Sequence, residues 1–317
     1  GRARVLSLAE AHEGREGIEH ILRITYACNE RCPFCFIPRR SAVDSASLER
    51  ELDVLARKVG PRGTLTISGG EPALDPRLPA LLAYARRRGL RRFALQTNGC
   101  GLSEPGRLEQ LLRLGVTGYD VAFHAHEPAL YDRITASRGQ YARALAGLRK
   151  LLACRSCAVT ACVLVLAGNH RKLPAMMGFL GRLARQQKRS SRDPLQICFT
   201  MLNGAGHERA PRLAVDLALA APWLARALAR APREGLLVQR FTGEASLPAC
   251  LAPDPARYAS ELSFAQDRVF YGEDFAGLVG RAKRPSCRDC PYDAHCLGVP
   301  AEYARRFGLA ALGVRRG

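Results

Sequence analysis

Strand-like and helix-like segments alternate over the first two thirds of the chain. Runs typical of β-strands occur at 21–27, 64–68, 92–97, 118–124, 157–166 and 195–201. Between them, helical periodicity occurs at 45–59, 77–89, 104–114, 140–153 and 171–187. This order requires crossover connections, so we expect an α/β fold with a parallel sheet. Periodicity alone leaves open whether that sheet is doubly wound or closed into a full or partial barrel.

The alternation ends near residue 205, where we predict a domain boundary. A helical stretch at 213–230 precedes a Pro-rich tail in which Pro and Asp surround three cysteines, a pattern that favours loops. A small domain of this kind gains stability from a bound metal. We therefore expect an N-terminal extension (1–20), a core domain (21–205), a helical connection (206–235) and a small loop-rich C-terminal domain (236–317).

The composition is that of a folded globular protein. The 317 residues are 47% hydrophobic and 24% charged, which excludes a disordered chain. The apolar runs at 161–167 and 213–221 are too short to span a bilayer, and the first residues lack the order of a secretory signal. We therefore expect a cytoplasmic protein with no membrane partner.

The net charge of +19 raises the question of a nucleic-acid partner. Only five of the 48 basic residues are Lys, a bias that GC-rich codons produce without selection for a polyanion. Nucleic-acid binding is therefore possible but not favoured. One local basic face is expected on and after the helix at 171–187, formed by Arg182, Arg185, Lys188, Arg189 and Arg192.

The most specific motif, CNERCPFC, follows the first predicted strand. It contains three of the twelve cysteines, Cys28, Cys32 and Cys35. Three thiolates on one loop can hold three irons of a cubane cluster and leave the fourth iron open for a reaction. The alternative is a structural zinc site completed by a distant ligand.

With Phe34 before its last cysteine, this motif resembles the signature of the radical S-adenosylmethionine (SAM) superfamily. SGGEP at 68–72, after the second strand, is similar to that family's glycine motif, and glycines permit close backbone approach to a ligand. TNG at 97–99 and the stretch from His124 continue the resemblance. It covers about residues 21–205 and implies a partial (β/α)6 barrel.

The resemblance also implies cofactors and their ligands. SAM is expected to bind the open iron of a [4Fe-4S] cluster and to yield a 5′-deoxyadenosyl radical that abstracts a substrate hydrogen atom. We expect His124 and His126 near cofactor or substrate, the alternative being hydrogen-bonded loop histidines. Asn169 is expected at the adenosine ribose, the alternative being a turn residue. The predicted cofactor-binding residues are Phe34, Ser68, Gly69, Gly70, Glu71, Pro72, Asn98, His124 and Asn169.

A second cysteine motif, CRDCPYDAHC, contains Cys287, Cys290 and Cys296. It resembles the SPASM and twitch domains that hold auxiliary [4Fe-4S] clusters. The SPASM pattern continues with a further cysteine where this chain has Pro300, so we expect one auxiliary cluster. Cys250 is predicted as its fourth ligand. Asp289 or His295 in that role, an open iron, or a zinc knuckle are alternatives.

The other five cysteines give less information about function. Cys154 and Cys157 have the spacing of a redox or zinc pair, but they lie at the end of a predicted helix and the start of a strand, so we interpret the spacing as coincidence. Cys162 and Cys198 lie within predicted strands and are expected in the core. Cys100 follows TNG near the strand ends and is a weak candidate for a catalytic hydrogen donor.

We rank modification of a ribosomal peptide or protein first, because it is common in family members with such a tail. A small-molecule radical dehydrogenase or carbon-skeleton enzyme ranks second, and RNA modification third. A reductase with flavodoxin, or a ferredoxin, is the expected electron donor. An iron–sulfur electron carrier that never cleaves SAM is the alternative outside catalysis, and SGGEP argues against it.

Overall fold

One parallel sheet organises the part of the chain that the computed structural model describes, which is residues 19–35, 37, 43–60, 63–202, 208–239, 247–252, 254, 268–271, 281–293, 296 and 298–313. Its strand order is β7-β6-β5-β4-β3-β2-β1-β8, and each neighbouring pair is parallel. The strands are β1 (Glu19–Thr25), β2 (Thr64–Gly69), β3 (Arg92–Thr97), β4 (Val116–Ala122), β5 (Ala158–Leu164), β6 (Gln196–Thr200), β7 (Leu237–Val238) and β8 (Arg268–Tyr271).

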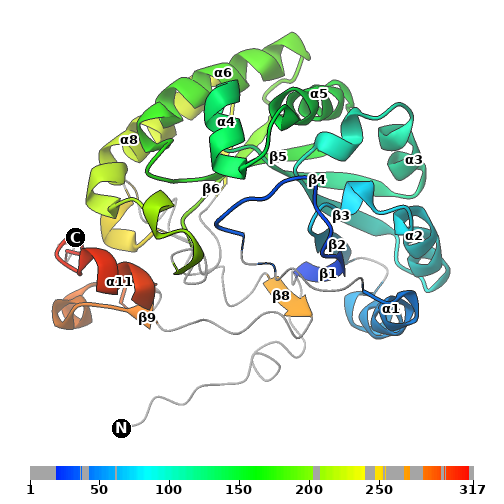
Figure 1. Cartoon of the computed structure of the whole chain (residues 1–317), viewed down its shortest axis with the longest axis horizontal. Helices are drawn as coiled ribbons and strands as arrows, with labels where there is room; N and C mark the ends of the chain where they lie inside the picture. Colours follow the sequence, from blue (N-terminus) through cyan, green and yellow to red (C-terminus); the bar gives the residue numbers. More distant parts are fainter. Residues whose placement is uncertain are drawn as a thin grey trace, which may run out of the picture.

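Helices connect the strands and cover the outer side of the curved sheet, so that the two form an open arc, a partial barrel (Figure 1). The expected α/β fold is thereby confirmed, with β1 to β6 at the six predicted positions. The helices are α1 (Ser45–Val59), α2 (Leu78–Arg87), α3 (Arg107–Arg113), α4 (Pro128–Thr135), α5 (Gln140–Ala153), α6 (Leu173–Gln186), α8 (Leu217–Arg230) and α11 (Ala301–Phe307).

Helix α1 illustrates how the sequence sets these elements. The Asp44 carboxylate accepts a hydrogen bond from the Ser47 N–H at 2.9 Å and caps the first turn. Leu48, Leu52 and Leu55 recur at helical spacing and are buried against the sheet. Gly60, with φ of +66°, ends the helix in a conformation that other residues avoid.

The tail contacts the core through both backbone and side chains. Strands β7 and β8 come from the predicted C-terminal domain yet extend the core sheet, β8 by pairing with β1 from Glu19 opposite Arg268. Strands β9 (Arg281–Ala282) and β10 (Val299–Pro300) form an antiparallel pair of their own. The division at residue 236 therefore stays a prediction.

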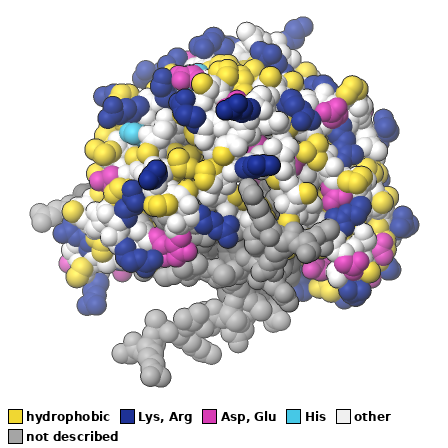
Figure 2. Space-filling view, in the orientation of Figure 1, with side chains coloured by type: hydrophobic (Ala, Val, Ile, Leu, Met, Phe, Trp, Pro, Cys, Tyr) yellow, Lys and Arg dark blue, Asp and Glu magenta, His cyan; other side chains and the backbone are white. Residues whose placement is uncertain are grey.

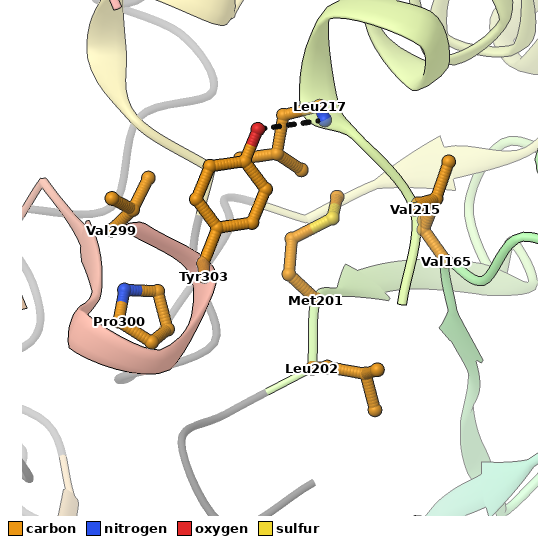
Figure 3. Close-up of a pocket in the computed structure, with 8 residues that line it drawn as sticks. All are labelled: Val165, Met201, Leu202, Val215, Leu217, Val299, Pro300 and Tyr303. Atoms are coloured by element: carbon orange, nitrogen blue, oxygen red, sulfur yellow. Dashed lines mark hydrogen bonds between the residues drawn. The ribbon is translucent and has the colours of Figure 1, made fainter. Parts of the chain in front are cut away.

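A small apolar cavity marks where the tail packs on the core (Figure 3). The Tyr303 hydroxyl closes one side of it by accepting a hydrogen bond from the Leu217 N–H and donating one to the Asp216 carboxylate, both at 3.0 Å. The residues that line it are Val165, Met201, Leu202, Val215, Leu217, Val299, Pro300 and Tyr303. Side chains at the carboxyl ends of β5 and β6 thus pack directly against residues that follow Cys296.

Four of the five residues of the basic face expected near α6 are exposed, namely Arg182, Arg185, Lys188 and Arg192. The Arg189 guanidinium is buried, and Arg185 pairs with the Glu234 carboxylate at 3.0 Å. Lys and Arg side chains are spread over the visible face rather than gathered in one patch (Figure 2). Among the described residues, helices long and apolar enough to cross a membrane are absent.

Candidate active site

The predicted site residues meet at one edge of the sheet, where its parallel strands end. The loop with Cys28, Cys32 and Cys35 follows β1, and SGGEP ends β2. Asn98 follows β3, His124 follows β4 and Asn169 follows β5. Ligand sites of parallel α/β sheets lie at this edge. The topology therefore brings together residues separated by more than a hundred positions.

The glycines of SGGEP pack against the backbone that leads into the cysteine loop. The Gly70 N–H donates to the Thr25 carbonyl at 2.7 Å, and the Glu71 N–H donates to the Ala27 carbonyl at 2.8 Å. A methyl group at Gly70 would overlap the Ala27 carbonyl, and Gly69 has φ of +154°. Ser68, in β2, is paired with Arg23, and Pro72 starts a 3-10 turn. Packing within the protein therefore requires glycine at positions 69 and 70, independently of any bound ligand.

Glu71 links this loop to the end of β3. Its buried carboxylate accepts hydrogen bonds from the Ala73 N–H at 2.9 Å, the Thr97 hydroxyl at 2.6 Å and the Asn98 N–H at 2.6 Å. Burial raises the pKa of Glu71 to about 7, although these three donors oppose the rise. In the structure, the carboxylate of Glu71 therefore holds two of the predicted cofactor-binding motifs together.

Asn98 connects the same region to the cysteine loop. Its side-chain amide donates to the Asn29 oxygen at 2.8 Å and lies 3.9 Å from the Cys28 sulfur. Asn29 in turn donates to the Gln140 side chain at 2.8 Å. The adjacent Cys100 is fully buried, and its thiol lies 3.6 Å from the Gln140 carbonyl oxygen. A catalytic role for Cys100 stays a prediction, and this burial does not favour contact with a substrate.

Phe34 and His124 bring the cysteine loop against the end of β4. Their rings meet edge to face with centroids 5.4 Å apart, and the His124 Nδ1 accepts a hydrogen bond from the Leu164 N–H at 3.3 Å. Burial lowers the pKa of His124 to about 4, so the imidazole is neutral at physiological pH. His126 lies farther along, 3.9 Å from the Glu127 carboxylate and beside the Phe179 ring.

The neutral His124 gives a testable pH dependence. Its pKa is about 6.5 in the unfolded chain and about 4 in the folded protein, so the unfolded state binds more protons between these values. The free energy of unfolding should therefore be insensitive to this group above pH 7 and fall by about 2 kcal/mol by pH 5. Denaturant unfolding of the wild type and His124→Gln across this range measures the difference. A difference that does not change with pH would contradict the prediction.

Asn169 occupies its side chain with backbone groups. Its oxygen accepts from the Leu166 N–H at 2.8 Å, and its amide donates to the carbonyls of His124 at 2.8 Å and Leu164 at 2.7 Å. Asn169 is 1% exposed. The geometry shows a residue that joins the ends of β4 and β5, and the predicted ribose contact stays a prediction.

Sequence reasoning missed Glu30, which lies inside the cysteine motif itself. Its buried carboxylate accepts a hydrogen bond from the Tyr131 hydroxyl at 2.7 Å and lies 3.6 Å from the Cys32 sulfur. The Arg31 N–H donates to the Thr135 carbonyl at 3.0 Å, so the loop is fixed to α4 at two points. An acidic residue between cysteines and a tyrosine in the helix after His124 were the available signals.

The three thiols of the loop after β1 are the donor type that a [4Fe-4S] cluster binds. Burial, aided by the Glu30 carboxylate, raises the pKa of the Cys32 thiol, and bound metal reverses this effect because it binds thiolate. Within the described residues, sets of three or more His, Cys, Asp or Glu side chains arranged around one metal ion are absent. The thiolates of a cubane bind different irons, so their sulfurs need not converge on one point.

A second group of cysteines comes together in the tail. Cys250, Cys287, Cys290 and Cys296 all line one cavity, together with Lys283 and Asp293. The Gly298 N–H donates to the Cys296 sulfur at 3.4 Å, and the 3-10 turn Pro285–Asp289 sets the spacing of Cys287 and Cys290. Cys250, predicted from sequence as the fourth ligand, is therefore placed with the other three, whereas Asp289 does not line the cavity. His295 lies outside the described residues.

Known proteins are similar to this chain over part or most of its length. A GTP 3′,8-cyclase of Xanthomonas campestris pv. campestris is 32% identical over 137 residues, 40% of each protein, so the match spans less than half of that relative's length. A PqqA peptide cyclase of the same organism is 26% identical over 306 residues, 86% of this chain and 78% of the relative.

Streptococcus suis SuiB bound to S-adenosylmethionine, a protein also solved with its precursor peptide SuiA, superposes with a TM-score of 0.65 at 12% identity. The superposition covers 94% of this chain and 76% of SuiB, and it shows a shared fold. Residues 22–180, half of the chain, match the profile of the radical SAM superfamily. The chain belongs to the radical SAM superfamily.

Proposed function

We propose that this chain is a radical SAM enzyme that modifies a ribosomally made peptide or protein. A [4Fe-4S] cluster and SAM are the cofactors of the superfamily, as the sequence predicted. When bound, the reduced cluster would supply the electron for cleavage of SAM to methionine and a 5′-deoxyadenosyl radical, which would abstract a hydrogen atom from the substrate. Cys28, Cys32 and Cys35 would hold this cluster.

The chain's own residues position this chemistry. SGGEP would present backbone at the strand ends to the methionine part of SAM, with Glu71 fixing that loop to Asn98. Phe34 and the neutral His124 pack edge to face and would limit access of water to one side of the cysteine loop. A reductase with flavodoxin, or a ferredoxin, would deliver the electron.

The observation that carries the peptide assignment is the gathering of four cysteines around one cavity in the tail. It supports an auxiliary [4Fe-4S] cluster in a SPASM-like or twitch-like domain. The chain would then combine a radical SAM core with an auxiliary cluster domain. The PqqA peptide cyclase matches 86% of this chain, more than the core alone, and SuiB binds a precursor peptide on the same fold. These likenesses support a peptide substrate ahead of a small molecule or RNA.

Anaerobic reconstitution with iron and sulfide, followed by dithionite and SAM, tests the reaction class. The expected product is 5′-deoxyadenosine, formed above the level of a Cys28→Ala control. Equal amounts in both would favour the electron-carrier alternative. Incubation with short peptides encoded beside this gene then tests the substrate, with a mass change of the peptide as the expected result.

Cys250→Ala separates the two clusters. Its sulfur lines the tail cavity with the other three thiols, so its loss should alter the paramagnetic resonance spectrum of the auxiliary cluster. The spectral shift that SAM induces in the first cluster should persist, because Cys250 lies outside that site. An unchanged auxiliary spectrum would eliminate Cys250 as a ligand.

A further inference from the structure

Cys154 and Cys157 meet in the turn that joins α5 to β5. The Cys157 N–H donates to the Cys154 carbonyl at 3.3 Å and closes a four-residue turn. A β-turn keeps its first and last Cα atoms within about 7 Å, which overlaps the span of a disulfide. The two cysteines lie, as the sequence predicted, between the end of α5 and the start of β5, and the interpretation of their spacing as coincidence stays untested.

The Cys154 sulfur is surrounded by hydrogen-bond donors. Its neighbours are the Ser156 hydroxyl at 3.2 Å, the backbone N–H groups of Ser156 and Cys157, and the Cys157 thiol. Burial raises the pKa of the Cys154 thiol, but these donors outweigh it, and the pKa lies below its ordinary value. Cys154 is half-buried, whereas Cys157 is 1% exposed and burial raises its pKa. Cys154 is thus the more accessible of the two thiols and the more readily deprotonated.

A buried arginine fixes the shape of this turn. The Arg189 guanidinium donates to the carbonyls of Cys154 at 2.7 Å and Cys157 at 3.0 Å. It also donates to the carbonyls of Leu151 and Leu152, both at 2.9 Å, and pairs with Asp193. These bonds hold the backbone of both cysteines in place.

The pair lies apart from the cluster sites. It precedes the amino end of β5, whereas Asn169 and His124 lie past the carboxyl ends of β5 and β4. Neither sulfur lines the tail cavity. The proposed radical chemistry therefore leaves this dithiol unused.

We propose that Cys154 and Cys157 form a thiol–disulfide exchange site for small disulfides of the glutathione class. The Cys154 thiolate attacks one sulfur of the disulfide, breaks its S–S bond and releases one thiolate, which takes up a proton from water. Cys157 then loses its proton to water and attacks the Cys154 sulfur, which forms the internal disulfide and releases the second thiolate. The protein dithiol is oxidised by two electrons, and the small disulfide is reduced to two thiols.

The test treats the anaerobically prepared, cluster-loaded full chain with oxidised glutathione and maps its tryptic peptides without reduction. Trypsin cleaves after Lys150, Arg155 and Arg171, so Cys154 and Cys157 fall in separate peptides, 151–155 and 156–171. We expect these two peptides to be joined by a disulfide. Cys162→Ser serves as the matched control, because Cys162 shares the second peptide, and it should leave the cross-link intact.

Two variants test the separate steps of the proposed thiol–disulfide exchange. Cys157→Ser should stop the reaction at a glutathionyl group on Cys154. Ser156→Ala removes a donor to the Cys154 sulfur and should slow its alkylation at pH 7 by about threefold. If the wild type gives no cross-linked peptide, and Cys154 reacts with iodoacetamide no faster than Cys162, the proposal is wrong.

Discussion

Replacing Cys28, Cys32 and Cys35 together with Ala should abolish 5′-deoxyadenosine formation and leave about half of the iron. The loop after β1 would lose every proposed ligand of the first cluster, whereas the four cysteines that line the tail cavity are unchanged. Two four-iron clusters give about eight irons per chain, so the variant should retain about four. Iron and sulfide analysis of anaerobically reconstituted protein, with product analysis by chromatography, measures both effects.

The matched control removes thiols that the cluster proposal does not use. A Cys154→Ala, Cys157→Ala double variant should keep the full iron content and the full yield of 5′-deoxyadenosine. Complete loss of iron from the triple variant would show that the tail holds none. Full retention would show that the loop after β1 is not the first site.

Gly70→Ala should be the most damaging single methyl group added near the cysteine loop. The new side chain would meet the carbonyl of Ala27, which is backbone and cannot rotate away. The loop must then move and weaken the bonds from Gly70 to Thr25 and from Glu71 to Ala27. We expect a loss of about 3 kcal/mol in the free energy of unfolding, and less iron at the first site. Denaturant titration and iron analysis measure these losses.

Gly168→Ala is the control for this substitution. Its added methyl group would lie 3.6 Å from a Leu130 methyl carbon, an ordinary van der Waals contact. The free energy of unfolding should change by less than about 0.5 kcal/mol, because nothing is displaced. Equal destabilisation by both variants would mean that the clash at Gly70 is relieved by local movement.

The elements of the core could be read from sequence because periodicity and capping act locally. The helices at 45–59 and 140–153 have the predicted bounds, since their buried leucines recur at helical spacing. Strand β8 was missed, because its pairing with β1 depends on a contact between distant segments and leaves little local pattern. Tertiary context, rather than propensity, decides such a strand.

The cysteines of the candidate site could be predicted from the sequence more fully than the residues that hold their loops in place. Cys250 was predicted with the tail motif because it is the one other thiol in the tail, and it lines the same cavity as Cys287, Cys290 and Cys296. The bonds from Glu30 to Tyr131 and from Asn169 to His124 could not be foreseen, because each joins segments whose distance only the folded sheet defines. The same reason hid the hydrogen bonds from Arg189 to the carbonyls of Cys154 and Cys157.

Strand β8 has a consequence for synthesis of this protein on the ribosome. The outer edge of β1 emerges first, yet its hydrogen-bonding partner is translated only after nearly the whole barrel. Until then that edge presents unpaired backbone groups, a template on which nascent chains can associate. Shortening the chain before residue 268 should therefore lower its yield in the supernatant after expression, even though every cysteine of the first motif is retained.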